Sequence, residues 1–154
     1  KAEPVAVGGE SAELAQEAAQ ALAEVEDVDT AAVFADIYRR AKHPEAKETA
    51  IEAMADEHAP AAIQALGRLL KAENDPEWRE KMVEALGGSE SDEAVPILIE
   101  AAKTDPEVDV RTAAVAALGD IKTPKARQAL LDLLKGKKDA AGRGTDEERD
   151  GHGL

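Results

Sequence analysis

The chain has 154 residues, enough for one domain with a continuous core, and Ala, Leu, Val and Ile supply most of its 44% apolar residues. Only 2% of the residues are aromatic, and this Ala-, Leu- and Glu-rich composition predicts an all-helical protein. The net charge of −14 argues against a nucleic-acid partner, because an acidic surface repels phosphate backbones, and the absence of cysteine excludes disulfides and thiolate metal sites.

The predicted elements are helices joined by short loops between two irregular ends. Residues 1–10 show no helical period, so we expect an N-terminal arm there. First helices of successive pairs are predicted at about 11–25, 44–57, 76–87 and 106–119, and second helices at about 30–42, 60–72, 92–103 and 124–135. Residues 137–154 are charged and glycine-rich, which predicts a disordered tail.

Proline and aspartate mark where first helices begin. Asp75 and Asp105 each precede a proline, which is the pattern of an N-cap followed by proline at the first helical position. In the fourth pair this pattern predicts that the first helix starts at Pro106. That start lies two residues earlier, relative to the apolar columns, than the start at Pro76 in the third pair. Gly119 is predicted to end the same helix as a left-handed cap.

A repeat of 32 residues is the strongest pattern in the chain. Six apolar columns recur in all four units, which are expected over residues 11–42, 43–74, 75–104 and 105–136. One column consists of Leu22, Met54, Leu86 and Leu118, and an alanine precedes each member. One helix pair cannot bury both of its apolar faces, whereas stacked pairs share a core. We therefore predict an α-solenoid, a right-handed superhelix of about four antiparallel helix pairs.

Two of the units resemble a known repeat family. The runs DPEWREKMVEALG with DEAVPILIEAAK, and DPEVDVRTAAVAALG with TPKARQALLDLLK, are similar to HEAT repeats of the short type also found in phycobilin lyases. Arg79 and Arg111 occupy the arginine position of that pattern, whereas Lys47 and Ala15 stand there in the second and first repeats. The resemblance covers residues 43–136 by pattern and 11–42 by register. It implies an α-solenoid with a protein-binding role, and it implies no reaction.

Charged residues on the second helices form the main candidate surface. One column lies near the C-terminal ends of these helices and consists of Arg39, Lys71, Lys103 and Lys135. These bases either complement the helix dipole or form a basic ladder that holds an acidic peptide. A second column consists of Asp36, Arg68, Glu100 and Asp132.

Two interpretations of the second column remain open. Neighbouring members are predicted to form salt bridges between repeats, each worth about 0–1 kcal/mol. Alternatively, the column joins Gln64 and Gln128 in a polar recognition surface on the concave side, where second helices of HEAT-like solenoids commonly lie.

The last repeat is expected to leave an apolar edge. Leu131 aligns with Ile99, which would contact the following repeat, but no further repeat follows in this sequence. The tail, a dimer partner or a binding target would cover this edge, or the edge marks a sequence cut from a longer repeat protein. Elsewhere, Phe34 and Tyr38 are predicted to pack in the core of the first repeat, with the Tyr38 hydroxyl group reaching solvent. Trp78 is predicted to be a core or semi-buried packing residue, with a binding hot spot as the alternative.

The sequence predicts a non-enzymatic protein–protein interaction or scaffold module. It would bind a protein or peptide partner through the concave second-helix face or the C-terminal edge. We expect no catalytic residues, no cofactor and no metal site, because the three histidines are scattered and no nucleophile motif occurs. The alternatives are a phycobilin-lyase-like enzyme or accessory protein and a purely structural repeat without a ligand. A soluble protein without a membrane span is expected, either cytoplasmic or exported, and a monomer is preferred to an oligomer.

Overall fold

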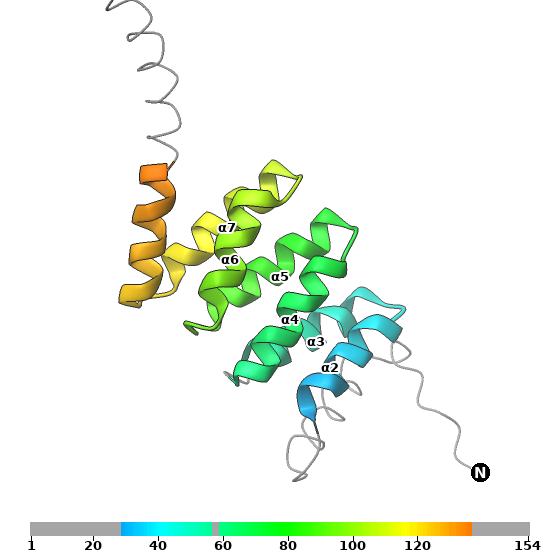
Figure 1. The fold of residues 1–154 in the computed structure, drawn as a ribbon. Coiled ribbons are helices and arrows are strands. Elements are labelled where there is room, and N and C mark those ends of the chain that lie inside the picture. The colour runs from blue at the N-terminus through cyan, green and yellow to red at the C-terminus, as the bar shows by residue number, and fades with distance from the viewer. Residues whose placement is uncertain (1–28, 57–58, 137–154) are drawn as a thin grey trace, which may run out of the picture.

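The computed structural model describes residues 29–56 and 59–136, and within these ranges every regular element is a helix. In chain order they are α2 (Thr30–Arg40), α3 (Pro44–Asp56), α4 (Pro60–Ala72), α5 (Pro76–Gly88), α6 (Ala94–Thr104) and α7 (Val108–Asp120), followed by a helix over residues 124–136. Figure 1 shows these helices as a stack of antiparallel pairs. The predicted arm, the helix at 11–25 and the tail lie outside the described residues.

Side-chain caps explain several of the helix starts. The Asp29 carboxylate accepts a hydrogen bond from the Ala32 backbone N–H group at 3.1 Å at the start of α2. Asp75 caps α5 by accepting from the Glu77 N–H group at 2.9 Å, and Pro76 occupies the first turn. The prediction of an Asp-Pro start is therefore confirmed for α5.

The predicted early start of α7 at Pro106 is wrong. Asp105 accepts from the Glu107 N–H group at 3.0 Å, as Asp75 does in the preceding repeat. Glu107 nevertheless keeps an extended backbone, with φ −95° and ψ 128°, and its carbonyl accepts the first helical hydrogen bond from Arg111. The helix therefore begins at Val108, after a connection of the same length as those before α3 and α5. The prediction that Gly119 ends this helix as a left-handed cap is also wrong, because α7 continues to Asp120 and Ile121 is its C-cap.

The spacing of the second helices is less regular than that of the first. Helices α3, α5 and α7 begin at residues 44, 76 and 108, whereas α4 and α6 begin at residues 60 and 94. The turn before α6 includes Glu90 in the left-handed conformation, with φ 55°, and this turn delays the start of α6. A strict period of 32 residues and the handedness of the superhelix stay predictions.

The helices form two layers around one core. Helices α3, α5 and α7 pack in sequence against each other, and so do α2, α4 and α6 (Figure 1). Met54, Leu86 and Leu118 of the first layer are completely buried, as are Leu66 and Leu98 of the second. The apolar columns predicted from the sequence thus lie between the layers, where burial removes their side chains from water.

Helices α5 and α7 approach each other closely at Gly87. A Cβ atom on Gly87 would lie 2.7 Å from the Cβ atom and 2.8 Å from the Cα atom of Ala117. The small residues at these positions let the two backbones come together, and Ala117 is the alanine that precedes Leu118 in the repeat.

Candidate functional site

The predicted partner surface lies on the second helices α2, α4, α6 and 124–136. We use the term second-helix face for the exposed side of these four helices. The eleven residues predicted for the surface are all exposed. They are Asp36, Arg39, Gln64, Arg68, Lys71, Glu100, Lys103, Gln128, Leu131, Asp132 and Lys135. Binding of a partner by these residues stays a prediction.

Charge is divided unequally between the two layers. The four second helices contain eight Lys or Arg residues and three Asp or Glu residues, a net charge of +5. The first helices α3, α5 and α7 contain four bases and nine acids, a net charge of −5. An acidic chain therefore presents one layer that is positive, and this layer will attract anionic groups.

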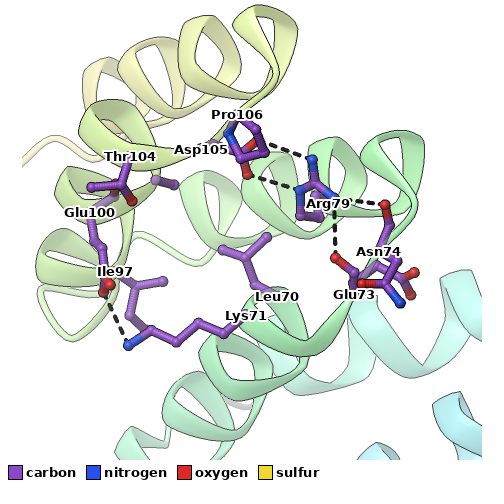
Figure 2. Close-up of a pocket in the computed structure, with 11 residues that line it drawn as sticks. Leu70, Lys71, Glu73, Asn74, Arg79, Ile97, Glu100, Thr104, Asp105 and Pro106 are labelled. Carbon is purple, nitrogen blue, oxygen red and sulfur yellow. Dashed lines mark hydrogen bonds and ion pairs between the residues drawn. The ribbon is translucent and has the colours of Figure 1, made fainter.

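The predicted ladder of salt bridges from Asp36 through Arg68 to Glu100 is not formed. Asp36 pairs at 3.1 Å with Arg40, four residues further along the same helix. Glu100 pairs at 3.1 Å with Lys71 rather than with Arg68 (Figure 2). The equivalent of Glu100 in the preceding repeat is Arg68, but the partner of Glu100, Lys71, lies almost one turn further along α4. The prediction was wrong because α4 and α6 are offset along their axes.

Several bases of the second-helix face have no acidic partner. Among the residues that the structure describes, Arg39, Arg68, Lys103 and Lys135 form no ion pair. Arg39, Lys71 and Lys103 lie in the last turns of their helices, where the helix dipole favours a positive charge. The dipole explains the position of these three bases. Arg39 and Lys103 also lack an acidic partner among the described residues, whereas Lys71 pairs with Glu100.

Two shallow grooves run between neighbouring second helices. The groove between α2 and α4 has a volume of about 210 Å³, and Arg39, Gln64 and Arg68 meet along it. The groove between α4 and α6 has a volume of about 330 Å³. In Figure 2 the Lys71–Glu100 pair spans one part of this second groove, and Arg79 lies with Asp105 at the other.

Sequence reasoning missed the ion pair between Arg79 and Asp105, although it identified each residue for another reason. Arg79 Nε lies 2.9 Å and Nη2 3.1 Å from the two carboxylate oxygens of Asp105, and both side chains are nearly buried. Arg111, at the same position in the next repeat, donates to the Asp105 carbonyl at 2.7 Å. The sequence did contain a signal for this pair. An arginine recurs at one position of the repeat, and an aspartate stands in the turn that leads into the next repeat.

A second polar cluster surrounds Tyr38. Phe34 and Tyr38 are buried and Trp78 is half-buried against the core, as predicted. The Tyr38 hydroxyl group was expected to reach solvent, but it donates a hydrogen bond to Glu73. The Lys47 ammonium lies 5.0 Å from the Tyr38 ring centroid and 5.1 Å from that of Trp78. The hydroxyl stays inside because Glu73 and Lys47 close over the ring.

The electrostatics of this cluster shift two pKa values. Burial raises the pKa of Tyr38, and the hydrogen bond and negative charge of Glu73 raise it further. Burial alone would raise the pKa of Glu73, but hydrogen bonds from Tyr38 and the Asp75 N–H group, with the charge of Lys47, lower it overall. The cluster holds a neutral phenol beside a carboxylate, which is a packing arrangement between repeats.

The C-terminal edge of the stack is apolar and open. Leu131 is 54% exposed and Leu134 is 62% exposed on the helix 124–136. On α7, Val115 is 41% exposed and Val108 is also exposed. Between α6, α7 and this last helix lies a groove of about 720 Å³, which Lys103 and Asp132 also line.

Other kinds of site find no support in the described ranges. No group of His, Asp or Glu residues within them could hold a metal ion. No helix described here is long and apolar enough to cross a membrane.

Helix pairs stacked in two layers around a shared core define the protein as an α-solenoid. The family model for HEAT repeats matches residues 3–87 and again residues 69–145, so the chain belongs to the HEAT repeat family. Members of this family commonly act as scaffolds for protein interactions. No curated protein matches the sequence.

Proposed function

We propose that this chain is a non-enzymatic scaffold module that binds an acidic segment of a protein partner along its second-helix face. The observation that carries the proposal is the net charge of +5 on the four second helices of a chain whose total charge is −14. A positive surface on a chain of opposite net charge attracts anionic groups locally. It matches a ligand that carries carboxylates.

The unpaired arginines supply the most specific contacts. Arg39 and Arg68 line the same groove between α2 and α4, and neither side chain has an acidic partner among the described residues. A guanidinium group can bind a carboxylate with two parallel hydrogen bonds, which fixes the orientation of the bound side chain. Ala35 and Ala65 line the same groove, so a peptide backbone has room between the two arginines.

Lys71 can contribute although it is already paired. Its side chain is 65% exposed and that of Glu100 is 52% exposed, so the ion pair between them is largely solvated. Exposed pairs of this kind contribute only about 0–1 kcal/mol. A carboxylate of the partner can therefore share or replace Glu100 at little cost. Lys71 is the base through which the groove between α4 and α6 contributes. Arg79 pairs with Asp105, and Glu73 also lines this groove.

The proposal of a non-enzymatic role rests on the chemistry of the grooves. Neither groove of the second-helix face is lined by histidine or by an aromatic side chain. A lyase that cradles a tetrapyrrole would need such groups, and no observation on the described residues favours that alternative.

The test measures binding of a fluorescein-labelled peptide of alternating glutamate and serine by fluorescence anisotropy at low salt. The double variant Arg39→Glu, Arg68→Glu is expected to lose at least about tenfold in affinity, which corresponds to about 1.4 kcal/mol. Lys71→Glu, Lys103→Glu should weaken binding as well. Added salt should weaken binding to the unchanged protein, because it screens exposed charges.

A matched control separates this surface from a change in total charge. Lys42→Glu, Lys122→Glu alters the net charge by the same amount, but both residues are exposed in loops outside the second helices. This control should bind the peptide within about twofold of the unchanged protein. Equal losses in the control and in the double arginine variant would contradict the proposal.

A further inference from the structure

We propose that the C-terminal edge is a self-association surface that receives the N-terminal end of a second copy of this chain, head to tail. We define the C-terminal edge by Val108, Thr112, Val115 and Gly119 of α7 together with Leu131 and Leu134 of the last helix. This inference goes beyond the proposed function, because the binding of an acidic segment centres on the grooves between α2, α4 and α6. The two surfaces share Lys103, which also lines the groove at the C-terminal edge.

The exposed face of α7 repeats a face of α5 that is covered. On α5, Val83 is buried, and Gly87 lies one turn further along in contact with Ala117 of α7. The register equivalents on α7 are Val115 and Gly119. Val115 is 41% exposed, and among the described residues only Leu130 Cδ1, at 4.0 Å, approaches the Cβ position of Gly119. Helix α7 therefore exposes the same kind of face that α5 uses to pack against α7, and no described helix covers it.

The helix that fits this continuation must present a small residue to Gly119. In the α5–α7 interface the small residue is Ala117, and the same column holds Ala21, Ala53 and Ala85. Ala53 and Ala85 are already partly buried within the stack. Ala21 lies in the segment predicted from the sequence as the helix at 11–25. That segment of a second copy therefore offers the matching residue, placed by register.

Charge favours the same pairing. Residues 1–28 contain seven acids and one base. At the C-terminal edge, α7 and the last helix together carry four bases and three acids, a net charge of +1, and Lys103, Arg111 and Asp132 line the groove of about 720 Å³. An acidic N-terminal end and a basic C-terminal edge attract each other.

Two other occupants fit less well. Residues 137–154 contain no large apolar residue before Leu154, so they lack the side chains needed to cover Leu131, Leu134 and Val115. Two C-terminal edges facing each other would bring the bases of one copy against those of the other. A head-to-tail contact avoids both problems, and because it is heterologous it continues to a ring or an open chain of copies.

Sedimentation velocity over a range of concentrations tests the surface. The unchanged protein should show a mass that rises with concentration. Val115→Glu should weaken this self-association at least about tenfold, because it buries an unpaired carboxylate in the contact. Ala116→Glu is the matched control, since its register equivalent Glu84 stays exposed although α7 packs on α5.

Both variants are expected to keep the helical content of the unchanged protein, and circular dichroism measures it. If the unchanged protein stays monomeric at every concentration, or if Val115→Glu associates as strongly as Ala116→Glu, the proposal is overturned.

Cysteine cross-linking tests which ends meet, and the natural chain contains no cysteine that would interfere. The full-length variants Gly119→Cys and Ala21→Cys are mixed and oxidised. A disulfide forms only where the Cα atoms come within about 7 Å, so the mixed dimer should exceed that from Ala116→Cys with Ala21→Cys by about tenfold. A predominance of Gly119→Cys linked to itself would show that the edges meet tail to tail and would overturn the head-to-tail contact.

Discussion

Arg79 and Asp105 join two inter-helix connections through a bidentate ion pair, with N–O distances of 2.9 and 3.1 Å. Arg79 belongs to α5, and Asp105 follows the last residue of α6. The remaining Nη1 group donates to the backbone carbonyls of Glu73 and Asn74 at 3.1 and 2.9 Å (Figure 2). One guanidinium group therefore holds together the turn before α5 and the turn before α7.

Loss of this arginine should be costly. Arg79→Ala leaves the Asp105 carboxylate nearly buried without its cation, and breaking a buried pair in this way costs about 3–5 kcal/mol of unfolding free energy. Arg40→Ala is the control, because it removes an exposed pair within one helix that is worth about 0.3–0.5 kcal/mol. Urea denaturation of the three proteins measures the difference. A loss for Arg79→Ala no larger than that of the control would contradict this account of the pair.

The two adjacent glycines at the end of α5 should respond in opposite directions to alanine. Gly87→Ala places a methyl group against the Ala117 backbone, and such overpacking costs about 1–3 kcal/mol. No atom of the described residues lies within 4 Å of the Cβ position of Gly88, so Gly88→Ala should stabilise the fold by about 0.4–1 kcal/mol. Thermal melts of the two variants check the prediction, which fails if both change the melting temperature in the same direction.

Leucines of the second layer should differ in how much unfolding free energy is lost when each is replaced by alanine, because they differ in burial. Leu98 is completely buried in the core, so Leu98→Ala should cost about 2–5 kcal/mol. Leu131 is 54% exposed, so Leu131→Ala should change the stability of the monomer by less than about 0.5 kcal/mol. Denaturant unfolding at low protein concentration, where self-association is minimal, measures both values. Similar losses for the two variants would show that the register of the second helices is wrong.

The repeat pattern predicted the fold well because burial and helical spacing act locally. Met54 and Leu86 were assigned to the core from their column alone, and both are completely buried. The start of α7 was missed because an Asp-Pro pair can cap a helix or can end a turn, as Asp105 does. The backbone conformation of Glu107 decides between these cases, and nothing in its residue type reveals it.

The candidate surface was predictable in part. Exposure of Arg39 and Arg68 followed from their position on the polar side of each second helix. The partners of Asp36 and Glu100 did not, because they depend on the offset between neighbouring helices, which register in the sequence cannot give. The excess of positive charge on the second layer was present in the sequence, but it becomes visible only when residues are counted by layer.

Tyr38 should resist ionisation for as long as the chain is folded. Its pKa is raised from the ordinary value of 10.0 by burial and by Glu73, so the folded state keeps the phenol proton at a pH where the unfolded state has lost it. Above pH 10 the unfolded state binds fewer protons than the folded state, so the unfolding free energy falls as the pH rises. The contribution of the neutral Tyr38 side chain to the unfolding free energy is fully present below pH 10 and is lost as the pH rises above 10 toward the raised pKa of the folded state.

The only tyrosine of the chain makes this titration easy to follow. Ultraviolet absorbance of the phenolate should show no transition near the ordinary pKa, and ionisation should coincide with the loss of helical circular dichroism. Glu73→Gln keeps an acceptor for the hydroxyl group and removes the negative charge, so its phenolate should appear at lower pH than in the unchanged protein. A phenolate signal with its midpoint near pH 10 in a fully helical protein would contradict the position of Tyr38 beneath Glu73 and Lys47.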